Sequence, residues 1–122
     1  MSDNNQVESK VDYMLIDKKN EMIRCFSNII EWFGPKVKDI TSLDPIVEDR
    51  LKQMYGIDIA IYHYDQKQTI TYQLKKSEMI DNKIHTYTLK TDVIWWTNTN
   101  GSYRPILIGY HDFDYNKGEE HA

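Results

Sequence analysis

The sequence predicts an α+β fold in which N-terminal helices pack on a mixed, largely antiparallel sheet. Apolar residues recur at helical spacing within residues 11–55, and β-branched and aromatic residues dominate the segments after Gly56. The chain has 122 residues, 40% hydrophobic and 28% charged, which suits one soluble domain. We therefore expect a disordered tail over 1–10, a single domain over 11–115 and a frayed end over 116–122.

The first predicted helix runs from Val11 to Phe33, and the pattern leaves open a break near Asp17. Gly34-Pro35 ends it. Cys25 lies beside the apolar stripe, and we interpret it as a small buried side chain rather than a reactive thiol. The stripe follows helical spacing and comprises Met22, Ile23, Phe26, Ile29, Ile30 and Phe33.

The second predicted helix begins at Asp44-Pro45, with Asp at the N-cap and Pro at the first helical position, and it ends at Gly56. Glu48 borders its apolar stripe. One interpretation of Glu48 is an exposed pair with Lys52 at i,i+4, worth roughly 0.2–0.5 kcal/mol. The stripe itself is made of Val47, Leu51, Met54 and Tyr55.

Residues 56–76 predict two strands joined by the polar turn Asp65–Gln68. Such a turn pairs Tyr64 with Thr69, and the register then extends to the open end of the hairpin. There the opposed pairs are Asp58 with Lys75 and Ala60 with Gln73.

Opposed residues share a face, so this register divides the hairpin into two faces. The core face carries Ile57, Ile59, Ile61, Ile70, Tyr72 and Leu74, with His63 and Lys76 at its ends. The other face carries Asp58, Ala60, Tyr62, Thr69, Thr71, Gln73 and Lys75. An acid, an amide and an amine thus converge at the open end.

The rest of the chain predicts a polar connector or short helical turn over Ser77–Lys83, then strands over Ile84–Leu89 and Asp92–Thr97. Asn98–Gly101 has the Asn-Gly signal of a hairpin turn. A returning strand over Ser102–Tyr110 contains Pro105, which favours a sheet edge. From His111 onward we expect a polar, frayed end.

The residues Gly56-Ile57-Asp58 and Gln73-Leu74-Lys75 on adjacent strands resemble the PD-(D/E)xK nuclease superfamily, which includes restriction enzymes and Holliday-junction resolvases. The Q-x-K variant is similar to the Mrr-like branch. The resemblance covers residues 45–76 and implies a restriction-endonuclease-like core. That core usually has a helix after the Lys strand, whereas residues 76–92 contain no strongly amphipathic helix.

This resemblance implies a Mg²⁺- or Mn²⁺-dependent DNA endonuclease. We expect a dimer, because cleavage of a duplex needs two sites, and the small size of the chain suits a nuclease encoded by a virus or mobile element. Its catalytic residues would be Asp58, Gln73, Lys75 and Glu48. The metal would take oxygen ligands from Asp58, Glu48, the Gln73 side chain and the Leu74 carbonyl. Lys75 would orient or deprotonate the attacking water, whose pKa the metal lowers.

The same residues also suit a solvent-exposed sheet face on which Asp58 and Lys75 form a surface salt bridge of about 0–1 kcal/mol. The net charge of −4 is unfavourable for a protein that binds phosphates through Lys and Arg. The alternative function is therefore a non-enzymatic acidic interaction module, for example a viral inhibitor. It would bind a host or partner protein through its sheet edge or aromatic hairpin.

Two further groups of residues can each be interpreted in two ways. His111, Asp112 and Asp114 suit either a metal site or a solvated tail. The aromatic residues near the second hairpin suit either base stacking or the core, and they are Trp95, Trp96, Tyr103 and Tyr110.

The expected cellular location follows from targeting signals that are not seen in the sequence. No apolar run approaches the ~20 residues that a membrane span needs, and the first residues are polar and acidic. The single Cys25 cannot form an internal disulfide. We expect a cytoplasmic protein without a membrane partner, in the host cytoplasm if it is viral.

Overall fold

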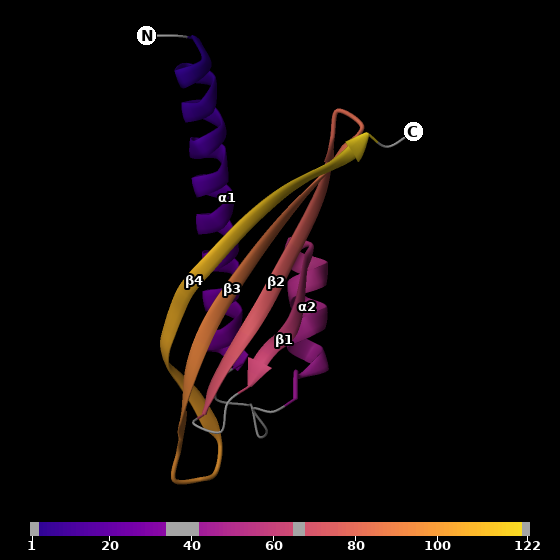
Figure 1. Ribbon diagram of the computed structural model, residues 1–122. Helices are drawn as coiled ribbons and strands as arrows, with labels where there is room; N and C mark the ends of the chain where they lie inside the picture. Colours follow the sequence, from indigo (N-terminus) through magenta and orange to yellow (C-terminus); the bar gives the residue numbers. More distant parts are fainter. Residues whose placement is uncertain (1–2, 34–41, 65–67, 121–122) are drawn as a thin grey trace.

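The computed structural model describes the backbone of residues 3–33, 42–64 and 68–120 and the side chains of 13–31, 42–64 and 68–118. Its elements are α1 (Asp3–Phe33), α2 (Pro45–Tyr55), β1 (Ile57–Tyr64), β2 (Thr69–Ile80), β3 (Lys83–Thr97) and β4 (Tyr103–Glu120). The strands form one sheet in the order β1-β2-β3-β4, and every neighbouring pair is antiparallel. Both helices pack on one face of this curved sheet (Figure 1). The α+β class is confirmed, but the expectation of a mixed sheet is wrong for the described strands.

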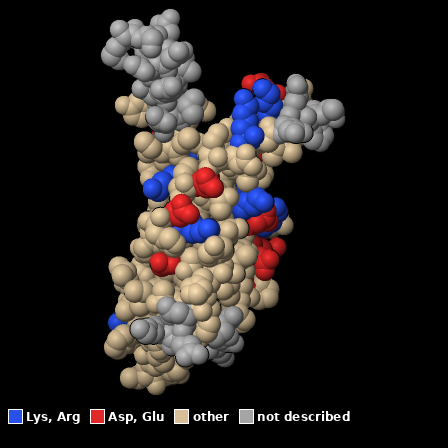
Figure 2. All heavy atoms as spheres, in the orientation of Figure 1, with Lys and Arg blue, Asp and Glu red and all other residues tan. Residues whose placement is uncertain are grey.

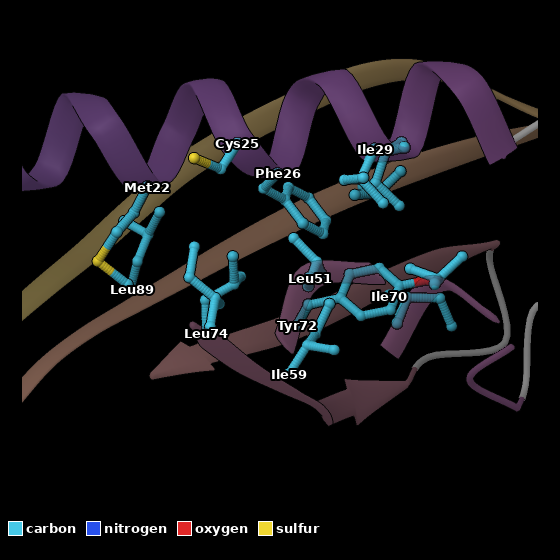
Figure 3. Packing of buried hydrophobic residues seen from close by; sticks show 14 of the residues in the cluster. Met22, Cys25, Phe26, Ile29, Leu51, Ile59, Ile70, Tyr72, Leu74 and Leu89 are labelled. Atoms are coloured by element: carbon cyan, nitrogen blue, oxygen red, sulfur yellow. The ribbon is translucent and has the colours of Figure 1, made fainter. Parts of the chain in front are cut away.

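The apolar stripe of α1 lies on the sheet and forms the centre of the core (Figure 3). Met22 and Phe26 are fully buried, and the Phe26 ring lies 5.5 Å from the Tyr72 ring, centroid to centroid. Leu51 of α2 is also fully buried in this cluster. The buried interpretation of Cys25 is confirmed, because its side chain is 8% exposed.

The bounds of α1 differ from the prediction. The helix begins at Asp3, within the expected tail, and it continues through Asp17 without a break. No proline or glycine interrupts residues 3–33, so nothing in the sequence forces a break there. The helix ends at Phe33. The predicted stop at Gly34-Pro35 lies outside the described residues.

The second helix has the predicted caps. The Asp44 side chain accepts a hydrogen bond from the Ile46 backbone N–H at 2.8 Å. At the other end Gly56 has φ of 67°, and its N–H donates to the Lys52 carbonyl at 3.0 Å. This left-handed residue turns the chain directly from α2 into β1.

The predicted register holds at the open end of the first hairpin, where Asp58 pairs with Lys75 and Ala60 pairs with Gln73. Near the turn it is wrong, because Tyr64 pairs with Ile70 instead of Thr69. A β-bulge at Tyr62 gives β1 one extra residue and shifts the register beyond it. Residues 65–67 of the predicted turn lie outside the described part of the chain.

The predicted connector Ser77–Lys83 is wrong. Asp81 and Asn82 have φ of 53° and 63° and form a two-residue hairpin turn between β2 and β3. Two successive left-handed residues suit a type I′ turn, and Asp and Asn tolerate this conformation. No helix therefore follows the Lys75 strand within residues 76–120, and the two strands predicted over 84–97 are one.

The Asn98–Gly101 turn is confirmed: the Asn98 N–H donates to the Ser102 carbonyl at 2.7 Å, and Gly101 has φ of 86°. Pro105 lies on β4, at the sheet edge as predicted. The expected frayed end from His111 is wrong, because β4 extends to Glu120. Its aromatic residues pack against the core at alternate positions, and they include Phe113 and Tyr115.

Replacing Gly56 with Ala should destabilise the protein by about 1–2 kcal/mol, because a side chain disfavours the left-handed conformation that the turn requires. Urea unfolding measures the change. Gly109→Ala is a matched control, since a Cβ at either glycine meets no atom within 4 Å and Gly109 has no positive φ. Equal stability of the two variants would contradict this account of the α2–β1 turn.

Candidate functional site on the outer face of the sheet

The sheet face away from the helices, here called the outer face, is polar over its middle. On β3 the buried side chains alternate with partly exposed ones, and the alternate positions point outward. Figure 2 shows Lys and Arg interspersed with Asp and Glu over the middle of the molecule. Cross-strand pairing gives the outward residues of this region: Asp58, Ala60, Gln73, Lys75, Thr88, Lys90, Asp92, Asp112 and Asp114.

The structure brings three of the predicted site residues to this one face. Asp58 lies directly opposite Lys75, and Gln73 is two residues before Lys75 on the same strand. The Asp58 carboxylate, however, pairs with Lys52 of α2 at 3.1 Å. Both side chains of this pair are more than half exposed, so the bridge contributes about 0–1 kcal/mol.

The other two predicted residues lie elsewhere. Glu48 is exposed on α2 and forms no ion pair with any described residue, so the predicted Glu48–Lys52 pair is wrong. The Leu74 side chain is fully buried in the core. Only its backbone carbonyl is therefore available as the ligand that the resemblance implies.

A cavity of about 250 Å³ opens on the outer face beside Gln73 and Lys75. The Lys90 ammonium lies 3.9 Å from Asp112 Oδ2 and 4.1 Å from the centroid of the Tyr62 ring. Two lysines thus face two aspartates, and the cavity has no net formal charge. Its lining residues are Gln73, Lys75, Thr88, Lys90, Asp112 and Asp114.

Sequence reasoning missed the role of β4 in this cavity. Asp112 and Asp114 fall in the segment expected to fray, yet they alternate with Phe113 and Tyr115 at the two-residue period of a strand. That alternation was the signal that could have placed both aspartates on the outer face.

The proposed cluster of His111 with these aspartates does not form. His111 is the extra residue of a bulge on β4, and its Nδ1 lies 3.5 Å from Asp92 Oδ2. Asp92 also accepts a hydrogen bond from the Thr71 hydroxyl at 2.6 Å. Asp112 and Asp114 line the cavity instead.

The donor set on the outer face fits a magnesium ion poorly. A hard cation needs several oxygen ligands around one point. Here the Asp58 carboxylate forms an ion pair with Lys52, and the Asp112 carboxylate lies 3.9 Å from the Lys90 ammonium. Within residues 13–31, 42–64 and 68–118, no three His, Cys, Asp or Glu side chains are grouped so that they could hold a metal.

The outer face becomes apolar toward the β3–β4 turn, where Figure 2 shows few charged side chains. Ile94 pairs with Leu107, and Trp96 lies two residues beyond Ile94 on the same face. Trp96 and Leu107 are 54% and 58% exposed. We call Ile94, Trp96 and Leu107 the apolar end of the outer face.

The other aromatic residues near this hairpin belong to the core rather than to a base-stacking surface. Trp95 is 2% exposed, and the Tyr110 hydroxyl forms a hydrogen bond with that of Ser27 on α1. Burial raises the pKa of the core residue Tyr72 to about 12. Burial also raises the pKa of the Cys25 thiol, which disfavours the reactive thiolate.

A separate cluster of charges joins α1 to β2 on the helix-bearing face. Lys76 Nζ lies 2.9 Å from Glu21 Oε1, and Lys18 Nζ lies 2.7 Å from Glu78 Oε1. The hydrogen bond from Lys76 lowers the pKa of Glu21, although burial opposes this shift. For Lys18, burial lowers the pKa, but the hydrogen bond and charge of Glu78 outweigh it and raise the pKa.

No known protein family matches the chain, and neither the curated proteins nor the solved structures include one with significant similarity to it. Among the described residues, no helix combines the length and the apolar character that crossing a bilayer requires.

Glu21→Gln should lower stability at pH 7 by up to about 1 kcal/mol, because it removes one charge from the α1–β2 cluster. The Glu21 pKa is lowered by folding, so its contribution is present above the unfolded value near 4.5 and disappears as the pH falls through the folded value. Urea unfolding at pH 7 and pH 2.5 should therefore show a difference from the parent only at pH 7. Glu31→Gln, on an exposed position of α1, is the control. A difference that persists unchanged at low pH would contradict this assignment.

Proposed function

We propose that this protein is a non-enzymatic interaction module that binds a partner protein through the outer face of its sheet. The observation that carries the proposal is the apolar end, which exposes Trp96 and Leu107 on a surface that neither α1 nor α2 covers. Interfaces are enriched in Trp, and alanine scanning often finds Trp at their energetic centres.

The charges of the outer face support binding more than catalysis. The carboxylates of Asp58 and Asp112 each lie near a lysine of this same chain, so each already has a cationic partner. A polar surface around a cavity without net formal charge, beside an apolar end, resembles in composition a protein interface, in which a polar rim surrounds an apolar centre. The partner we expect therefore offers an apolar pocket for Trp96 and hydrogen-bonding groups for the cavity around Lys90.

Trp96→Glu should weaken partner binding by at least about tenfold, because it places a charge in the apolar centre of the interface. Crosslinking and mass spectrometry in lysates of the source cells would identify a partner, whose affinity is then measured by calorimetry with purified proteins. Tyr13→Glu is the matched control, since Tyr13 is an exposed aromatic residue of α1, 68% exposed. Equal affinity of the Trp96 and Tyr13 variants would overturn the proposal.

The second candidate is a metal-dependent DNA endonuclease that uses Asp58, Gln73, Lys75 and Glu48. Its supporting observation is the register, which places the first three on one uncovered face. A restriction-endonuclease-like core gains less support, because β2 turns directly into β3. To bind the metal, the Asp58 carboxylate would also have to break its ion pair with Lys52. Glu48 would have to reach the same ion.

Incubation with single-stranded, duplex and branched DNA in Mg²⁺ or Mn²⁺ distinguishes the two functions. We expect no cleavage by the parent protein, because Asp58 and Asp112 on the outer face lie near lysines of the same chain. Asp58→Ala and Lys75→Ala are run in parallel. Cleavage by the parent that both substitutions abolish would replace the interaction module with the nuclease.

A further inference from the structure

A second cavity, of about 330 Å³, lies on the opposite side of the sheet from the outer face. Its walls come from the first half of α1 and from β2, β3 and β4 near the β2–β3 turn. In Figure 1 this part of α1 and the strand ends diverge toward the top of the view. The volume falls within the range of small-molecule sites, about 300–1,000 Å³.

The body of this cavity is apolar and aromatic. Met14 of α1 and Ile80 of β2 line it and remain 64% and 40% exposed, so neither is sealed in the core. Tyr87 and Tyr115 form a stacked pair on the strands, with ring centroids 5.4 Å apart. Water over these surfaces would be displaced favourably by an apolar ligand.

A few polar groups converge at the strand end of the same cavity. His85 Nδ1 lies 2.7 Å from the Tyr115 hydroxyl, and His85 pairs directly with Lys117 across the sheet. Lys18 is already paired with Glu78. Lys117, in contrast, has no ion pair with any described side chain.

The cavity is therefore locally cationic on an acidic protein. Its charged lining residues are Lys18, Lys117 and Glu78, which sum to +1, while the chain carries −4. Such a site attracts an anionic group and disfavours a cation of the same size. Apolar walls with a few converging polar groups are the usual composition of a small-molecule site.

We propose that this cavity binds a small amphipathic carboxylic acid. The apolar body of the ligand lies between Met14, Ile80 and the two tyrosine rings, and its carboxylate accepts hydrogen bonds from Lys117 and His85. The site is separated from the outer face by the sheet, so it does not depend on the proposed protein partner.

Calorimetry with three probes of equal chain length tests the chemistry: decanoate, decanol and decyltrimethylammonium, each below its micelle concentration. We expect saturable binding of one decanoate per chain, about tenfold weaker binding of decanol and no binding of the cation. Binding of the cation as tight as that of decanoate, or no saturable binding of decanoate, would overturn the proposal.

Two substitutions locate the site. Lys117→Glu should weaken decanoate binding by about tenfold and leave decanol binding unchanged, and Met14→Glu should weaken both probes. Lys75→Glu makes the same change in net charge on the outer face and should leave the decanoate affinity within about twofold. The proposal fails if Lys117→Glu and Lys75→Glu weaken decanoate binding equally. It also fails if sedimentation shows that a second copy of the chain covers the cavity.

Discussion

The structure depends on the burial of the apolar stripe of α1 against one face of the sheet. An isolated long helix is marginal in water, and a meander of hairpins needs an apolar surface to pack against. Met22 and Phe26 supply that surface, and their contacts reach Tyr72 and Leu74 on β2 and Leu89 on β3. Removing the Phe26 ring alone would leave a cavity of the kind that costs about 3–5 kcal/mol, a large part of the stability of a small domain.

Burial on one face leaves the other face without a covering layer. Strand alternation then assigns every second residue of four strands to solvent, which explains the polar middle of the outer face without reference to catalysis. It does not explain Trp96 or Leu107, because an exposed position on a strand has no structural need for a large apolar side chain. The proposed binding surface therefore rests on these two residues.

The elements that could be predicted from sequence are those fixed by local pattern. The predicted turn length gives the register that places Asp58 opposite Lys75, and the alternation that buries Ile57 and Leu74 excludes a one-residue slip. The bulge at Tyr62 and the turn at Asp81 depend on backbone geometry that no hydrophobic pattern records. Predicting the cavity that Asp112 and Asp114 line requires both the strand alternation of residues 112–115 and the pairing of β4 with β3, and the sequence records only the first of these.

The edges of the sheet favour recognition through its face. Exposed strand edges invite pairing with another chain, and natural proteins blunt them with bulges, proline or a covering element. Here Pro105 and three register shifts interrupt β4, while the bulge at Tyr62 interrupts β1. A partner strand could not form a long regular ladder on either irregular edge. The outer face, with Trp96 at one end and a cavity without net formal charge at its middle, is the surface that we propose for a partner protein.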